Sequence, residues 1–203
     1  SPPSNAYVHA DRLEQAEQWV PLKVAVCQQC WLVQTEDYTS ADSLFDAEYA
    51  YFSSFSSTWL AHAERYVAEM VERFGLTADS RVVEIAANDG YLLQYVAGRG
   101  IPCLGVEPTR STAQAAREKG LEIRELFFGR ETAAQLIAEG WAADLMAANN
   151  VLAHVPDIND FTAGLEALLA PGGTITLEFP HLQQLLAQNQ FDSAGKPLPG
   201  LPL

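Results

Sequence analysis

The feature of the sequence that most constrains the fold is a regular alternation, over residues 81–179, of short apolar segments with amphipathic ones. The apolar segments predict buried strands, and the amphipathic ones repeat apolar residues every three or four positions, which predicts helices. Strands separated by single helices pair in parallel, because a parallel pair requires a crossover connection. The predicted strands are residues 81–86, 102–106, 121–126, 143–147 and 174–179, and the predicted helices are 59–74, 91–97, 112–119, 132–139 and 158–169. We therefore predict an α/β fold in which helices cover both faces of a parallel sheet.

The end of the first predicted strand and the loop after it carry acidic side chains at the place where such sheets bind ligands. Ligands of open α/β sheets lie beyond the carboxyl ends of the strands. Glu84 and Asp89 would repel a pyrophosphate there, and alanines stand at positions 86 and 87 where a dinucleotide-binding loop would be expected to carry glycine. Two carboxylates suit a ligand with a cationic centre, such as S-adenosylmethionine (SAM), which carries a sulfonium and an ammonium group.

A third acidic residue, Glu107, follows the second predicted strand, 23 residues after Glu84. A carboxylate about 20 residues beyond the first loop binds the ribose hydroxyls in nucleotide-binding sheets. The fourth strand ends in Asn149 and Asn150, which we expect beside the transferred methyl group. The residues predicted to bind the cofactor are Glu84, Ala86, Asn88, Asp89, Gly90, Glu107, Pro108, Asn149 and Asn150.

Two histidines follow strand ends and are ambiguous from sequence. His154 lies a few residues beyond Asn150, where it has either a catalytic role beside the methyl group or a structural one. His181 ends the segment 178–181 after the fifth strand, and a structural role is the stronger expectation for it.

The N-terminal segment contains a Cys-x-x-Cys pair, Cys27 and Cys30, between residues 21–26 and 31–34, which predict a hairpin. A helix is predicted over residues 12–19 and a linker over residues 35–58. The third cysteine, Cys103, stands alone, and three cysteines are too few for a disulfide framework. A reducing, cytoplasmic setting is therefore expected.

Charge and hydropathy exclude several kinds of partner. The 26 acidic and 12 basic residues give a net charge of −14, which disfavours binding to nucleic acid or to an anionic membrane. No apolar run reaches the ~18 residues of a transmembrane helix, and no secretory signal begins the sequence. The proline- and glycine-rich residues 193–203 predict a loosely packed tail.

Taken in order, these motifs resemble the C-methyltransferases of deoxysugar biosynthesis. The resemblance spans about residues 17–192 and rests on the segments 27–30, 49–54, 83–93, 105–108, 149–157, 178–181 and 190–192. It implies a Rossmann-like class I methyltransferase fold with SAM as the cofactor. It also implies a nucleotide-linked 4-keto-deoxysugar as the substrate, methylated at the carbon next to the ketone.

The resemblance further implies an N-terminal domain that binds zinc through four cysteines. Cys27 and Cys30 would be half of that site and the other pair would precede Ser1, so we expect a partial zinc-binding hairpin without tightly held zinc. A tyrosine of the linker, Tyr49 or Tyr51, would enter the active site, with Tyr49 slightly favoured; either is equally an aromatic anchor. The family places its presumed base in a Tyr-x-x-His segment after Phe-Asp, where this chain has residues 193–203 instead.

The sequence thus predicts a partial zinc-binding domain at 1–40, a linker at 41–58, a SAM-binding domain at 59–192 and a tail at 193–203. The leading hypothesis is a truncated C-methyltransferase whose isolated chain has no activity, with Tyr49, Tyr51 and His154 as catalytic candidates. The alternatives are an O- or N-methyltransferase of a small metabolite and a non-catalytic SAM-binding fragment.

Overall fold

The computed structural model describes residues 8–17, 19–21, 23–35 and 51–187. It divides into two compact units, of which one is Tyr51–Phe179 and the other combines the N-terminal segment with the residues from Pro180 onward. The predicted site residue Tyr49 and the predicted tail 193–203 lie outside the described residues.

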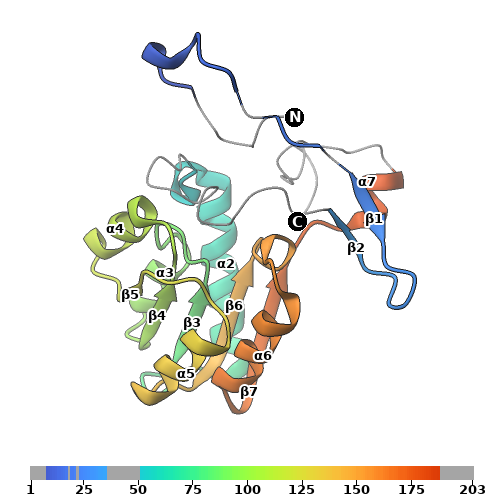
Figure 1. Cartoon of the computed structure of the whole chain (residues 1–203). Helices are drawn as coiled ribbons and strands as arrows, with labels where there is room; N and C mark the ends of the chain where they lie inside the picture. The colour runs from blue at the N-terminus through green and yellow to red at the C-terminus, as the bar shows by residue number, and fades with distance from the viewer. Residues whose placement is uncertain (1–7, 18, 22, 36–50, 188–203) are drawn as a thin grey trace. The chain divides into compact units, whose positions relative to one another are not determined.

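The unit Tyr51–Phe179 is built on a five-stranded parallel sheet with strand order β5-β4-β3-β6-β7 (Figure 1). Its strands are β3 (Val82–Ile85), β4 (Cys103–Val106), β5 (Ile123–Arg124), β6 (Ala143–Asn149) and β7 (Leu169–Glu178). Its helices are η2 (Ser53–Phe55), α2 (Ser57–Phe74), α3 (Leu93–Ala97), α4 (Arg110–Glu118), α5 (Arg130–Ala138), η3 (Leu152–His154) and α6 (Ile158–Leu168). The predicted α/β fold is confirmed.

Two hydrophobic clusters show that the helices cover both faces of the sheet. One cluster joins α2, α3 and α4 to alternate residues of the strands, with Val67, Val96 and Ala116 among its buried members. The other joins α5 and α6 to the opposite face, where Leu136 and Phe161 are buried. Buried apolar residues that are adjacent in a strand belong to different clusters, because side chains alternate between the two faces of a strand.

The order of the strands places the ligand-binding edge. From β3 the chain adds β4 and β5 on one side, then crosses over to add β6 and β7 on the other. Ile85, at the end of β3, pairs with Val106 of β4 and Ala148 of β6. In sheets whose strand order reverses in this way, ligands bind at the carboxyl edge beside the point of reversal, which here is the end of β3.

The start of β7 differs from the prediction. We expected a helix ended by residues 171–173 and a strand from residue 174, but β7 begins at Leu169, directly after α6. Ala143 pairs with Leu169 and Leu145 pairs with Thr174, so the extra residues form an irregularity in the β6–β7 pairing. Gly172 allows it, since its φ of 81° is one that a side chain disfavours.

The other unit contains η1 (Ala10–Arg12), the antiparallel hairpin β1 (Val24–Val26) and β2 (Val33–Thr35), and α7 (Leu182–Ala187). The predicted hairpin is confirmed. The helix predicted over residues 12–19 is wrong, because only the three-residue η1 forms there within the described segment. Among the described residues, no helix has the length and apolar character needed to span a bilayer.

Candidate functional site

Glu84 is the most deeply buried acidic group at the carboxyl edge of the sheet. It precedes the last residue of β3 and is 0% exposed, and among the described residues no hydrogen-bond donor satisfies either of its carboxylate oxygens. Burial raises its pKa well above the ordinary value, and the charges of Glu107 and Asp89 add to the rise. The Tyr91 hydroxyl and the Leu93 N–H oppose the rise without reaching hydrogen-bond geometry. A cationic ligand group would relieve this unpaired carboxylate.

The loop after β3 adopts backbone conformations that favour glycine, although only one of the residues concerned is a glycine. Ala86, Asn88 and Gly90 have φ values of 58°, 49° and 75°, so every second residue adopts the left-handed conformation. Glycine adopts this conformation freely and asparagine tolerates it, but alanine is strained there. The alternation explains why a search for a glycine-rich motif would miss a loop of this shape.

Glu107 is held in a fixed orientation at the start of the β4–α4 loop. Its Oε2 accepts a hydrogen bond from the Asn88 N–H at 2.8 Å, and its Oε1 accepts one from the Thr109 N–H at 2.9 Å. Burial raises the pKa of Glu107, and these two N–H groups oppose the rise. A carboxylate has about four acceptor positions, so each oxygen retains capacity for a further donor such as a ribose hydroxyl. Pro108 lies between Glu107 and Thr109 in the chain, and it is half-buried.

The side chains of Asn88 and Asp89 bind the segment Tyr51–Phe55, which we call the strap. Asn88 Oδ1 accepts from the Ser53 N–H at 2.8 Å, and Asn88 Nδ2 donates to the Tyr51 carbonyl at 3.1 Å. Asp89 Oδ2 accepts from the Ser54 N–H at 3.2 Å. The polar atoms of the Asn88 side chain therefore bind protein, whereas Asp89 Oδ1 is buried without a partner in the described chain.

Lys119, just beyond α4, reinforces the attachment of the strap. Its Nζ donates to the Asp89 carbonyl at 2.6 Å and to the Ser54 hydroxyl at 2.8 Å, and it lies 3.5 Å from Asp89 Oδ2. The strap carries the candidate Tyr51, which is half-buried. The sequence signal for this contact was the polar aromatic segment before α2, which we had interpreted as a linker.

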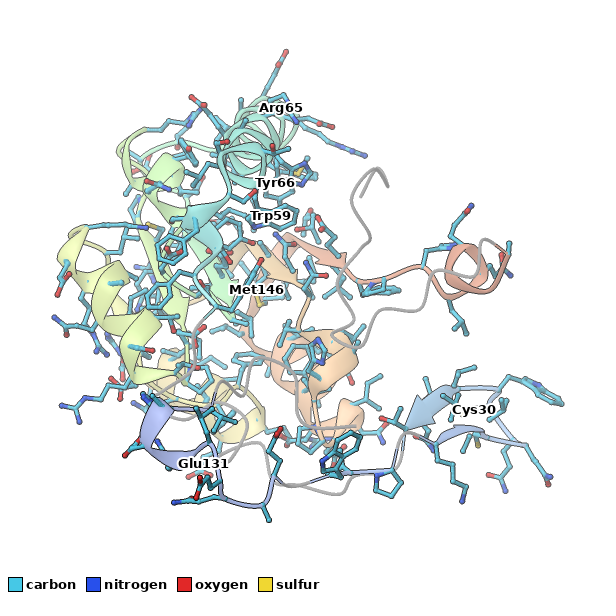
Figure 2. All side chains as sticks on the ribbon, turned by 90° about the horizontal axis from the view of Figure 1, so that it is seen from above. Cys30, Trp59, Arg65, Tyr66, Glu131 and Met146 are labelled. Carbon is cyan, nitrogen blue, oxygen red and sulfur yellow. The ribbon has the colours of Figure 1, made fainter. Side chains whose placement is uncertain are left out.

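The end of β6 is tied to α2 through two aromatic rings. Asn149 Nδ2 donates to the Tyr91 hydroxyl at 3.1 Å, and the Tyr91 ring stacks on Trp59 with centroids 5.7 Å apart. Figure 2 shows Trp59 and Tyr66 on the side of α2 that faces the sheet, whereas Arg65 points away from it. Tyr66 bonds the Thr176 hydroxyl at 2.5 Å, and burial raises its pKa to about 12. Sequence reasoning identified Asn149 here but missed all three aromatic residues.

Asn150 and His154 follow β6 on the same edge. Asn150 has a φ of 54°, and its N–H donates to the Glu178 carbonyl at 2.6 Å. His154 ends η3 with an exposed side chain, yet enough protein surrounds its ring for desolvation to lower the pKa of the imidazole. His181 is placed differently: its Nδ1 accepts from the Gln184 N–H at 3.2 Å and caps α7, which is a structural role.

The polar atoms left without partners gather at one edge of the sheet. Within the described residues they belong to Glu84 in β3, to Asp89 in the following loop, to Thr109 and Ser111 after β4, and to Glu178 at the end of β7. Buried polar groups are nearly always paired in folded proteins, so such a group of unpaired atoms marks a place for a polar ligand. Carboxylates beside β3 and β4 fit the ammonium, sulfonium and ribose groups of SAM.

Cys27 and Cys30 lie at the turn of the β1–β2 hairpin, where Figure 2 labels Cys30. Both thiols are free, and hydrogen bonds from the backbone N–H groups of Cys30 and Gln29 lower the pKa of Cys27. A lowered thiol pKa favours the thiolate that binds metals. Within the described part of the chain, no group of three or more His, Cys, Asp or Glu side chains could hold a metal ion.

Comparison with known proteins connects this geometry to a family. A family model of a methyltransferase domain matches residues 59–198, and one of a putative zinc binding domain matches residues 1–45. The plantazolicin methyltransferase BpumL, solved with SAH, matches with a TM-score of 0.51 over 68% of this chain and 52% of that chain. At 12% sequence identity, this structural similarity shows the shared fold alone.

Curated relatives point to the same chemistry. The chain is 36% identical over 173 residues to the C-methyltransferase NovU of Streptomyces niveus, covering 85% of this chain and 41% of that protein. It is 32% identical over 118 residues to a trans-aconitate 2-methyltransferase of Paracidovorax citrulli (strain AAC00-1), covering 57% of this chain and 45% of that protein. The chain thus spans less than half the length of these relatives. The methyltransferase-domain match covers well over half of the chain, including the whole sheet and its ligand-binding edge, so the chain belongs to this family of SAM-dependent methyltransferases.

Proposed function

We propose that the protein is a C-methyltransferase that transfers a methyl group from SAM to a nucleotide-linked 4-keto-deoxysugar, at the carbon next to the ketone. The observation that carries the proposal is the pair of buried carboxylates, Glu84 and Glu107, at neighbouring strand ends of a chain similar to a C-methyltransferase. The order of the sugar-enzyme motifs along residues 17–192 supports the substrate class.

Each part of the cofactor has a proposed partner among the described residues. When bound, SAM supplies an electrophilic methyl group on a positively charged sulfur. Glu107 would accept hydrogen bonds from the ribose hydroxyls, because its carboxylate is already oriented by two N–H groups. Glu84 and Asp89 would place negative charge near the ammonium and sulfonium, and Asn149 and Asn150 would border the methyl group.

Carbon methylation also needs proton transfer and charge stabilisation. A base must remove the proton next to the ketone, and a donor must stabilise the enolate oxygen that results. His154 suits the first task near pH 7, since its lowered pKa keeps the imidazole neutral. Tyr51, held on the strap by Asn88, or Tyr49 would donate to the oxygen.

The hairpin cysteines are proposed as ligands of zinc in the N-terminal domain. Cys27 and Cys30 lie in the segment that matches the putative zinc binding domain, and the N–H groups around Cys27 favour its thiolate. A structural zinc needs four ligands, so these two residues would supply half of the set.

Similarity to trans-aconitate 2-methyltransferases favours a second candidate, the methylation of a small carboxylic acid. The net charge of −14 does not separate the candidates, because the diphosphate of a nucleotide-linked sugar is anionic as well. The relative that is 36% identical over 85% of this chain is a C-methyltransferase, so carbon methylation stays the leading candidate.

The experiment that tests the function incubates the purified protein with methyl-labelled SAM and one acceptor at a time. The acceptors are thymidine-diphosphate-linked 4-keto-6-deoxyglucose and trans-aconitate. A labelled methyl group bound to a sugar carbon, identified by NMR, is the product that the proposal requires, and its formation by the 203-residue chain alone would overturn the expectation that this chain is inactive by itself. A methyl ester on trans-aconitate would establish the second candidate, and binding of SAM with no product from either acceptor would favour a non-catalytic module.

A further inference from the structure

A histidine and a glutamate from distant parts of the chain face each other near the end of β7. His62 lies on the second turn of α2, and Glu178 is the last residue of β7. His62 Nε2 is 3.4 Å from Glu178 Oε2, and the two side chains are 33% and 23% exposed. The pair is therefore accessible from solvent, unlike the buried Glu84.

The surroundings place this pair at the ligand-binding edge. The ring of His62 stacks on Trp59 with centroids 5.0 Å apart, and Trp59 also stacks on Tyr91. Glu178 pairs in register with Asn149, and its carbonyl accepts the N–H of Asn150. His62 and Glu178 are thus neighbours of the asparagines that would border the transferred methyl group.

The position of the pair across the sheet separates it from the cofactor residues. Glu84 is on β3 and Glu107 follows β4, whereas Glu178 is on β7, two strands from β3 on the opposite side. Adjacent strands are about 4.8 Å apart, so β7 lies about 10 Å from β3. A cofactor held by Glu84 and Glu107 leaves the β6–β7 side for the acceptor molecule.

The pair also has unused hydrogen-bonding capacity. Glu178 Oε1 is buried without a partner among the described residues. Nε2 of His62 faces the carboxylate, and no bond of its Nδ1 is seen in the described chain. An unpaired carboxylate oxygen next to an imidazole nitrogen can accept a hydrogen bond from a ligand hydroxyl group.

We propose that His62 and Glu178 form an acceptor-binding site that hydrogen-bonds a hydroxyl group of the sugar and orients its reacting carbon toward the methyl group. Glu178 Oε1 accepts the hydroxyl proton and His62 contacts the same or the adjacent hydroxyl. This assignment rests on the proposed function, because it requires a hydroxylated acceptor.

The test measures steady-state kinetics of the intact protein with thymidine-diphosphate-linked 4-keto-6-deoxyglucose, together with SAH affinity by calorimetry. Glu178→Gln and His62→Asn each remove one partner of the pair. Hydrogen bonds to charged groups correspond to about a 10- to 150-fold effect, so we expect the acceptor KM to rise by that factor. The Kd of SAH should stay within about twofold of wild type, and kcat should fall less than KM rises.

Glu72→Gln is the matched control, because Glu72 is an exposed acid three turns further along α2. The Tm of each variant shows whether the His62–Glu178 contact only stabilises the packing of α2 on β7 or has a role in binding. A lower Tm with an unchanged acceptor KM would overturn the proposal, and so would an equal loss of SAH affinity, which would place the pair against the cofactor. A wild-type protein that binds SAH but no keto sugar would instead overturn the proposed function, and this site with it.

Discussion

The side chain of Asn88 holds the backbone of Ser53, with Oδ1 accepting the Ser53 N–H at 2.8 Å. The backbone N–H of Asn88 donates at the same time to Glu107 Oε2, also at 2.8 Å. One residue therefore connects the carboxylate proposed to bind ribose with the strap that carries Tyr51. A ligand that draws Glu107 toward itself acts on Asn88 directly, so we infer that cofactor binding and order in the strap are coupled.

The first prediction concerns the two strap contacts of Asn88. Asn88→Gly removes both side-chain hydrogen bonds but suits the local φ of 49°. The free energy of unfolding should fall by about 1–3 kcal/mol, at roughly 0.5–1.5 kcal/mol for each bond. Asn150→Gly is the control, because Asn150 has a φ of 54° and no side-chain hydrogen bond is found for it in the described chain. If urea denaturation shows an equal decrease in the free energy of unfolding for the two variants, the role assigned to Asn88 is refuted.

The second prediction concerns Glu107 and the affinity for SAH. Glu107→Gln leaves one acceptor oxygen for two backbone N–H groups and removes the charge that would bind the ribose. Loss of a charged hydrogen-bonding group costs about 1.5–3 kcal/mol, so the Kd of SAH should rise about 10- to 150-fold. The comparison is Glu166→Gln, an exposed acid on α6. An unchanged Kd in folded Glu107→Gln protein would show that the ribose binds elsewhere.

The fold was predictable because it depends on periodicity, which the sequence displays directly. Each strand of the sheet and each helix between strands follows from apolar spacing, and the largest error, the start of β7, comes from an irregularity in pairing that no spacing reveals. The helix predicted over residues 12–19 failed for a related reason. A short amphipathic pattern needs tertiary packing to form a helix, and no residue of η1 is buried.

The positions of Glu84 and Glu107 at the ends of neighbouring strands could be predicted from the sequence, but the partners of the candidate site residues could not. Glu84 and Glu107 stand where strand order places ligand-binding carboxylates. The contacts of Asn88 with Ser53 and of His62 with Glu178 join residues 35 and 116 positions apart in the chain, and nothing local in the sequence signals them.

The third prediction concerns the backbone strain at Ala86. Its φ of 58° is unfavourable for a residue with a side chain, so Ala86→Gly relieves about 1 kcal/mol of strain. The greater flexibility of glycine in the unfolded chain offsets part of this gain, so stability should be unchanged or slightly higher. Ala87→Gly is the neighbouring control: Ala87 is fully buried, and loss of its methyl group should destabilise the protein by about 1 kcal/mol. A larger loss for Ala86→Gly than for Ala87→Gly, measured by chemical denaturation, would contradict this reasoning.

The fourth prediction concerns metal binding by the cysteine pair. Cys27 and Cys30 supply two of the four ligands of a structural zinc, and the full sequence contains one further cysteine, Cys103, which lies in β4 of the other unit. We expect the purified 203-residue chain to retain less than one zinc per chain after dialysis, as measured by elemental analysis. One tightly held zinc per chain would contradict this, and Cys30→Ser would then show whether the hairpin holds it.

The last prediction concerns the pH dependence that the buried Glu84 imposes. A carboxyl group whose pKa is raised on folding binds its proton more tightly in the folded chain than in the unfolded one. Its contribution to stability is therefore greatest at low pH and is lost as the pH rises from about 4.5 through the raised pKa. Glu84→Gln removes this ionisation, so the variant should be more stable than wild type at pH 8, with a difference that shrinks as the pH falls toward 5.

The difference in the free energy of unfolding between Glu84→Gln and wild type is taken at each pH. The contributions of the other titrating groups cancel in this difference. This matters because the lowered pKa of His154 acts with the opposite sign, removing stability as the pH falls below about 6.5. The same variant should bind SAH more weakly at pH 8, because the ammonium group of the ligand would lose the negative charge that Glu84 is proposed to supply. A side chain that lowers the stability of the free protein and raises its affinity for a cationic ligand has a functional role. If Glu84→Gln proves less stable than wild type across this pH range, the Glu84 carboxylate is favourably paired in the folded protein, and its pKa is not raised by burial.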